Sequence, residues 1–357
     1  MTFLNLTNTT KGDTTYLLVP ITYTLIFIVS VIGNCLFIAA VVYNVNMRTT
    51  VNLFLINMAA SDLLATVVSL PPRIVGCFSS FQWPFQQESL AGLVICKISV
   101  SIWLLSFAVS LATFISMSFE RLLAVFFPVK RSFLTKRTTL STFIIWAICI
   151  VFTIPSLFVL RVSKIRGSRQ CWIESNNPLD NVYWYFIIVT TGLTIAALFI
   201  VYPAILIKLW KRKLPGNPSS ANQEIRDRIN RRVTWMVSIL ITVFEVSWIP
   251  FFVISVILVQ NKNIYNNDFV AFKNEGTMLR TISLLLSHFS YTMNPIICVA
   301  FNKDFRSYVK KISCLILSRK RYKVSTHKTS PIHLANEPKM GRFNIKVNKR
   351  KMAETTL

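Results

Sequence analysis

Hydrophobic positions along this chain form long continuous runs rather than the mixed patterns of water-exposed helices and strands. A helix needs about 20 mostly apolar residues to cross a hydrocarbon core about 30 Å thick. Seven runs reach that length, and they are Tyr16–Asn44, Val51–Leu70, Cys96–Phe127, Thr139–Leu160, Val182–Ile207, Val233–Gln260 and Met278–Phe301. The pattern predicts an all-α membrane protein with a seven-transmembrane helix bundle over residues 16–301.

The region after the last run has a different, amphipathic pattern. Apolar residues recur every three or four positions between basic ones, at Phe301, Phe305, Val309 and Ile312. This spacing predicts a short amphipathic helix over 302–314 that lies on the membrane surface. Cys314 ends this helix and is a candidate for palmitoylation. Residues 315–357 are expected to form a disordered basic cytoplasmic tail.

Composition supports a membrane protein, because charged residues make up only 15% of the chain and about 25% of a typical globular one. The net charge of +25 is also typical of nucleic-acid-binding proteins. The distribution of the basic residues along the chain distinguishes the two interpretations. With the N-terminus outside, 28 lysines and arginines lie in the inner loops and tail, against eight in the outer segments. Basic residues favour the cytoplasmic side, so the charge reflects membrane topology and predicts no nucleic-acid partner.

This orientation makes residues 1–15 an extracellular N-terminus and the C-terminus cytoplasmic, in a multi-pass protein of the plasma membrane. Two sequons begin at Asn5 and Asn8 in the N-terminal segment. Both are predicted glycosylation sites, in agreement with an extracellular start.

Several polar and ionisable residues interrupt the apolar runs. They include Asn34, Asp62, Glu120, Arg121, Glu245, His288 and Asn294. Singly, each is explained by helix–helix hydrogen bonding. As an ordered set they favour a function, because ionisable groups inside a bilayer are costly unless they face the bundle interior.

Short motifs follow one another in the order of the runs. They are carried by Gly33-Asn34, Asp62 within Asn57–Leu64, Cys96, Glu120-Arg121, Trp146, Pro155, Cys171, Phe244, Trp248-Ile249-Pro250 and Asn294-Pro295. The arrangement resembles the rhodopsin-like (class A) G-protein-coupled receptors from about Tyr16 to Cys314. Each motif is weak alone, but the ordered series is specific.

The resemblance implies a receptor rather than an enzyme. An extracellular agonist would shift the helix bundle and open a cytoplasmic cleft, which promotes GDP release from a heterotrimeric G protein. Phosphorylation of the tail would then recruit arrestin. The chain also ends in a sequence in which Thr355 and Leu357 form a candidate ligand for a PDZ domain.

The resemblance also pairs Cys96 with Cys171, two cysteines on the predicted outer side. Oxidising conditions favour a disulfide there, and in the family this pair is bonded. The alternative is two free thiols. Cys77 is the only other cysteine expected on that side.

A core polar site is implied around Asp62. This residue, Ser110, Trp248, Ser290 and Asn294 match the positions that gather around a sodium ion in the family, and Asn34 belongs to the same polar core. A carboxylate among hydroxyls and an amide suits a hard cation. The alternative is a neutral hydrogen-bond hub. No other cofactor is expected, and retinal is excluded because no lysine lies between Gly276 and Asn302.

The activation machinery is expected in three places. Phe244, Trp248 and Pro250 would form the switch of the sixth helix, and Pro295 would break the seventh. Glu120 and Arg121 would form the G-protein coupling pair, with Arg121 released when the cleft opens.

Four positions depart from the family. Leu122 replaces a tyrosine, Thr194 stands at the place of the usual proline of the fifth helix, and Cys298 replaces the tyrosine of the Asn-Pro-x-x-Tyr motif. Glu245 is unusual inside the sixth helix, and nothing in the sequence accounts for it.

The ligand class is argued by exclusion. Trp103 stands where amine receptors carry an aspartate, so a small cationic amine lacks its counter-ion. An aromatic ligand pocket is predicted from Trp103, Phe107, Trp248, Phe251 and His288, with ordinary core packing as the alternative. The basic outer loop favours an acidic or amidated ligand, and the chain is most similar to the peptide-receptor branches, so a neuropeptide is the expected agonist. A non-peptide amine or lipid is the alternative.

Two other classes were weighed against a receptor. A transporter or channel needs a polar line through the bundle, and Asp62, Glu120 and Glu245 form no repeated ring. A membrane enzyme needs a catalytic motif, and neither His-Glu-x-x-His nor Gly-x-Ser-x-Gly occurs.

Overall fold

The computed structural model describes residues 11–78, 83–85, 89–126, 138–165, 168–173, 178–211, 221–260 and 272–326. The predicted sites at Asn5, Asn8, Thr355 and Leu357 lie outside these residues. The chain forms two structural units, which divide after Lys310.

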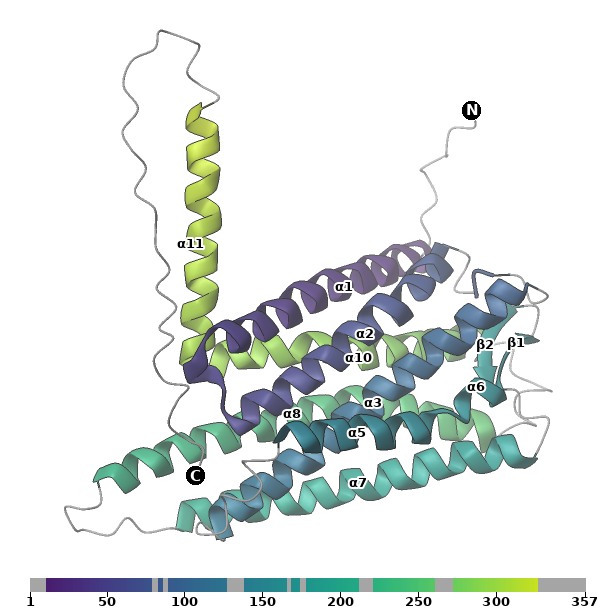
Figure 1. The fold of residues 1–357 in the computed structure, drawn as a ribbon. Coiled ribbons are helices and arrows are strands. Elements are labelled where there is room, and N and C mark those ends of the chain that lie inside the picture. Colours follow the sequence, from purple (N-terminus) through teal and green to yellow (C-terminus); the bar gives the residue numbers. More distant parts are fainter. Residues whose placement is uncertain are drawn as a thin grey trace. The chain divides into compact units, whose positions relative to one another are not determined.

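Seven long apolar helices are present in the described part of the chain, as the run pattern predicts. Figure 1 shows them side by side as a bundle. Their bounds, with the short elements between them, are α1 Lys11–Tyr43, η1 Val45–Met47, α2 Thr50–Phe78, α3 Leu90–Phe126, α5 Thr138–Thr153, α6 Ser156–Val159, α7 Pro178–Lys211, α8 Ala221–Gln260 and α10 Phe272–Phe301.

Helix α3 lies at the centre of the bundle. It packs against α2, α5, α7 and α8, whereas α1 packs between α2 and α10. Its span is the most buried of the seven, and those of α5 and α7 are the least. Exposed Leu, Ile, Val and Phe side chains cover the outer faces of the bundle, as expected for helices that contact lipid rather than water.

The fourth predicted run is divided in two. Helix α5 ends at Thr153, and α6 begins at Ser156 directly after Pro155. A proline has no backbone N–H and clashes with the carbonyl four residues before it, so it ends the longer helix. The Ser156 hydroxyl then lies 2.5 Å from that of Ser101 on α3.

A β-hairpin follows where the sequence predicts only an outer loop. Strands β1 Leu160–Ile165 and β2 Ser168–Ile173 pair antiparallel, with Val162 opposite Cys171. Val162 is buried against Cys96 and Trp83. The hairpin therefore packs on the outer end of α3.

Helix α11, Lys303–Thr326, begins where the amphipathic pattern predicts and continues beyond the predicted end at 314. The Asn302 side-chain oxygen accepts hydrogen bonds from the backbone N–H groups of Asp304 and Phe305, which caps the start of the helix. Residues 315–326 were expected in the disordered tail, but they include good helix formers and no glycine or proline.

The closest approach of α1 to α10 depends on a glycine. A Cβ atom at Gly33 would lie 2.6 Å from Pro295 Cγ and 3.0 Å from Pro295 Cβ. The next residue, Asn34, donates a hydrogen bond from Nδ2 to the Tyr291 carbonyl at 3.0 Å. Pro295 has no N–H to bond that carbonyl four residues earlier, so Asn34 supplies the missing donor.

Gly33→Ala should destabilise the bundle, because its methyl group would overlap the Pro295 ring and push α1 from α10. The expected loss is about 1–3 kcal/mol, seen as a lower melting temperature of the purified protein. Gly192→Ala is the matched control, since nothing lies within 4 Å of its added Cβ. Equal melting temperatures for the two variants would contradict the close contact.

Candidate functional site

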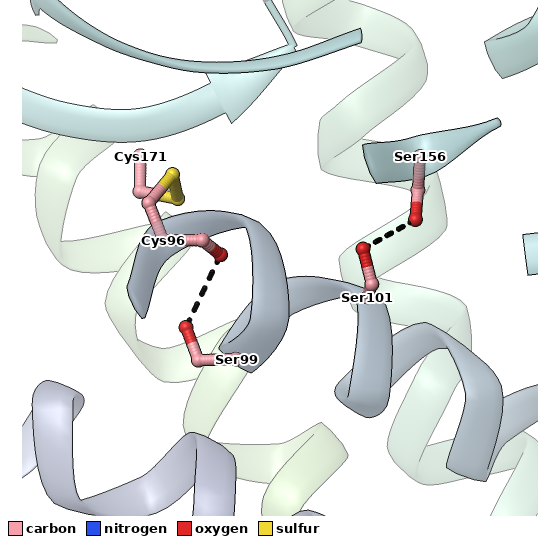
Figure 2. The surroundings of a disulfide bond; sticks show 5 residues. All are labelled: Cys96, Ser99, Ser101, Ser156 and Cys171. Atoms are coloured by element: carbon pink, nitrogen blue, oxygen red, sulfur yellow. Dashed lines mark hydrogen bonds between the residues drawn. A yellow bond between two sulfur atoms is a disulfide. The ribbon is translucent and has the colours of Figure 1, made fainter. Parts of the chain in front are cut away.

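The predicted disulfide between Cys96 and Cys171 is confirmed. The two Cα atoms lie 5.7 Å apart, and Figure 2 shows the bond joining α3 to the hairpin strand β2. The same figure shows Ser101 bonded to Ser156, which ties α3 to α6. The outer end of α3 is therefore fixed to two neighbouring elements.

All five residues of the predicted ligand pocket lie together. Trp103 stacks on Trp248 with ring centroids 5.1 Å apart and meets Phe251 edge-on at 4.7 Å. It also stacks on His288, and Phe107 contacts Trp248 at 4.4 Å. Each of the five side chains is at most 4% exposed. Their rings fill the space between the helices, so the group is a closed cluster whose members pack on one another.

The aromatic contacts continue inward from Trp248. Phe244, one turn further along α8, lies 5.9 Å from Trp248 and 5.2 Å from Phe114 of α3. Pro250 lies inside α8 and Pro295 inside α10, as the motifs predict. An unbroken series of ring contacts therefore runs from Trp103 toward the inner half of the bundle.

The predicted polar core is buried, and its members divide between two sets of contacts. Asn294 donates a hydrogen bond from Nδ2 to Asp62 Oδ2 at 2.7 Å. Asn34 bonds instead to Ser30 and to the Tyr291 carbonyl. Ser290 accepts a bond from Trp248 Nε1 at 3.3 Å, and Ser110 is buried nearby on α3. The direct partner of the carboxylate is thus Asn294.

Oxygen atoms around Asp62 suit a cation. Ser106 and Tyr291 both interact with Asp62. The hydroxyls of Ser106 and Tyr291 are buried and have no hydrogen-bond partner of good geometry within the described residues. A carboxylate with unsatisfied oxygens close by fits a hard cation such as sodium. The sequence reasoning missed Ser106, although it lies one turn from Ser110 on the same face of α3.

A second polar hub joins three helices on the other side of α2. Trp146 of α5 donates a hydrogen bond from Nε1 to Asn57 Oδ1 at 2.6 Å, and Asn57 donates from Nδ2 to Thr113 Oγ1 of α3 at 2.8 Å. The motifs identify Asn57 and Trp146 separately. Their contact could not be predicted, because no local spacing relates residues so far apart in the sequence.

The predicted coupling residues form an ion pair at the inner end of α3. Arg121 Nε donates to Glu120 Oε2, and both residues are only 4% exposed. Beside them, Leu122 packs against Ile205 of α7 where the family has a tyrosine. Separating such a pair in a low-dielectric environment is costly unless a new partner replaces it.

The departures from the family have local structural outcomes. Thr194 donates a hydrogen bond to the Thr190 carbonyl at 2.8 Å within an uninterrupted α7, so no bulge forms at the place of the missing proline. Cys298 is buried with no hydroxyl to offer. Glu245 is 1% exposed, and its Oε1 has no hydrogen-bond partner among the residues described.

A residue that the sequence analysis did not assign lies against the aromatic cluster. Arg73, near the outer end of α2, places its guanidinium carbon 5.4 Å from the centre of the Trp103 ring. The contact between Arg73 and Trp103 could not be predicted from spacing, because the apolar run was expected to end at Leu70.

The match to a known family agrees with this arrangement. Residues 33–298 match the model of the 7 transmembrane receptor (rhodopsin family). The chain therefore belongs to that family, the class A G-protein-coupled receptors. It is a multi-pass membrane protein and a receptor rather than an enzyme.

Several relatives are peptide receptors by name. The substance-P receptor of Cavia porcellus is 25% identical over 289 residues, which cover 80% of this chain and 68% of that receptor. The allatostatin-A receptor of Bombyx mori is 26% identical over 308 residues, 82% of this chain and 79% of its own length. The galanin receptor 2a of Danio rerio is 25% identical over 304 residues, 83% and 77% of the two chains.

The Asn57–Trp146 contact can be measured by a double-mutant cycle. Asn57→Ala and Trp146→Phe should each lower thermal stability, and the double variant should lose less than their sum. The expected coupling is about 1 kcal/mol. Trp146→Phe combined with Ser69→Ala is the control, since the Ser69 hydroxyl donates to the Ala65 carbonyl of its own helix. Additivity in both cycles would contradict the hub.

Proposed function

We propose that this receptor binds an extracellular peptide and couples it to a heterotrimeric G protein. The observation that carries the proposal is the buried Glu120–Arg121 pair at the inner end of the helix that also holds Trp103. Ligand-contacting and coupling residues then share one rigid element, α3.

The peptide class is supported by the names of the relatives and by the closed aromatic cluster. No aspartate stands at Trp103 to pair with a small amine, and the cluster is filled by its own side chains. A peptide can bind over the outer surface of such a cluster without entering the bundle, because its contact area does not depend on one deep cavity.

The proposed transmission step begins at Trp103. An agonist that displaces Trp103 changes its stacking on Trp248, and Trp248 contacts Phe244. Pro250 weakens the backbone of α8 just beside this point, so the inner half of that helix is free to move outward. A ligand shifts the equilibrium only by its differential affinity for the two packings.

The proposed output lies at Arg121. When the inner end of α8 moves away, Arg121 exchanges Glu120 for groups of the G protein, and GDP release follows. The receptor itself performs no covalent chemistry. The orientation with the extracellular N-terminus rests on the distribution of basic residues.

The modifications and tail partners stay predictions. Cys314 is exposed on α11 and available for palmitoylation. Arrestin binding to the phosphorylated tail and PDZ binding through Thr355 and Leu357 belong to the same proposal.

Coupling can be tested by guanine-nucleotide exchange on a panel of G proteins in membranes that carry this chain, challenged with a peptide library. Agonist-dependent exchange is expected in the native chain and should be lost in Arg121→Ala. Glu120→Gln should instead raise exchange without agonist several-fold, because the resting pair is weakened. The absence of exchange with every G protein, in membranes with normal receptor levels, would overturn the proposal.

The cation site can be tested without an agonist. Sodium should raise the melting temperature of the purified receptor relative to potassium at equal ionic strength, because a ligand that binds only the folded state stabilises it. Asp62→Asn should remove this difference. Glu245→Gln, which alters another buried acid of the bundle, should retain it. Equal melting temperatures in the two salts would leave Asp62 as a hydrogen-bond hub without an ion.

A further inference from the structure

The cation at the outer end of α2 lies in an unusual environment. Arg73 is half-buried, with its guanidinium over the face of Trp103. Its charge also acts on Tyr23, Tyr291 and His288. These residues come from α1, α3 and α10, so Arg73 lies where three other helices meet.

Among the residues whose side chains the structure describes, no acidic group forms an ion pair with Arg73. The ion pair found there joins Glu120 and Arg121, at the opposite end of α3. A cation–π contact is worth only about 0.5–2 kcal/mol. A partly buried cation inside a membrane protein indicates a functional contact by default, and no acidic side chain that the structure describes is paired with this one.

Two buried nitrogens beside Arg73 also lack partners. Trp103 Nε1 and His288 Nε2 have no hydrogen-bond partner within the described residues. The His288 Nδ1 atom lies 2.6 Å from the Leu284 carbonyl, so it carries the proton and Nε2 is an acceptor. Trp103 Nε1 is therefore an unused donor on the ring that bears the Arg73 guanidinium, and a donor beside a cation suits a ligand group that accepts hydrogen bonds.

The outer hairpin adds positive charge above this point. Arg161 is exposed on β1, and Lys164 stands directly opposite Arg169 in the strand register. Positive charge on this hairpin attracts an approaching anion over several ångströms.

We propose that the outer end of the aromatic cluster binds a carboxylate of the ligand, and that Arg73 is the residue that receives it. The inference rests on the proposed function, because the occupant is the extracellular agonist. Arginine binds a carboxylate through two parallel N–H groups. The carboxylate comes from either an acidic side chain or a free C-terminus, and these sources share one chemistry.

The position of Arg73 connects this contact to the switch. Trp103 bears the guanidinium and also stacks on Trp248, with an angle of 28° between the rings. A carboxylate that draws the guanidinium from the ring changes the packing of Trp103. Binding of the anion is thus sensed by Trp103, the side chain that contacts Trp248 of α8.

The experiment measures thermal stability of the purified full chain in lipid nanodiscs with three small probes. N-acetylphenylalanine carries a terminal carboxylate, N-acetylphenylalanyl-aspartic acid α-amide carries an acidic side chain, and N-acetylphenylalaninamide carries neither. Fragments of this size bind with dissociation constants in the millimolar range, so the probes are used at tens of millimolar. Sodium chloride is adjusted to equal ionic strength throughout.

At least one carboxylate probe should raise the melting temperature, and the neutral amide should do so with at least tenfold lower affinity. The more effective of the two acids identifies the source of the carboxylate. Arg73→Gln should remove the preference for the acid, and Arg73→Lys should retain part of it because the charge remains. Arg161→Gln is the matched control, and it should preserve the preference because this exposed residue lies outside the cluster.

Two results would overturn the inference. One is equal behaviour of acid and amide probes, including no shift with any of them. The other is an acid preference that persists in Arg73→Gln while Arg161→Gln removes it. If Arg73→Gln does not fold, Arg73→Lys and Arg161→Gln still decide between the two positions. Because no G protein is present, a failure of nucleotide exchange would leave this result standing.

Discussion

The hydrogen bond from Asn34 to the Tyr291 carbonyl holds together the part of the bundle on which the candidate sites depend. In a bilayer core, a backbone carbonyl without a donor costs several kcal/mol, and Pro295 removes the donor that Tyr291 would otherwise have. The asparagine reaches that carbonyl only because Gly33 lets α1 lie against the proline ring. One proline therefore requires a glycine and an asparagine on another helix. The same turn of α10 brings Asn294 to Asp62.

The aromatic cluster and the polar core meet at a single hydrogen bond. Trp248 belongs to the cluster, and its Nε1 atom donates to Ser290 in the polar region beside Asn294. If the Trp248 indole is displaced, either this hydrogen bond breaks or Ser290 moves with the indole. A cation held by Asp62 and a ligand that displaces Trp103 would therefore act on neighbouring atoms of α8 and α10. Two ligands bound at these places would be coupled without any long-range path through the protein.

The sequence was sufficient for features that follow from local chemistry. The length of the apolar runs predicted the seven spans, and the ordered motifs predicted the disulfide and the proximity of Asp62 and Asn294. It was insufficient where the outcome depends on packing between distant segments. Nothing in the spacing of Asn57 and Trp146 relates them, and Arg73 lies beyond Leu70, where the apolar run was expected to end. The length of α11 was underestimated because basic residues, read as tail, are also good helix formers.

The uninterrupted α7 changes where that helix is able to bend. Thr194 keeps the backbone N–H that a proline would lack, and the proline inside the helix is Pro203. At 1.5 Å per residue, the weak point is displaced by about 13 Å along the axis. The part of α7 before Pro203 is therefore expected to move as one rigid helix. A displacement near the start of α7 is then transmitted along the straight segment to Tyr202, which lies beside Pro203 and interacts with the Glu120–Arg121 pair.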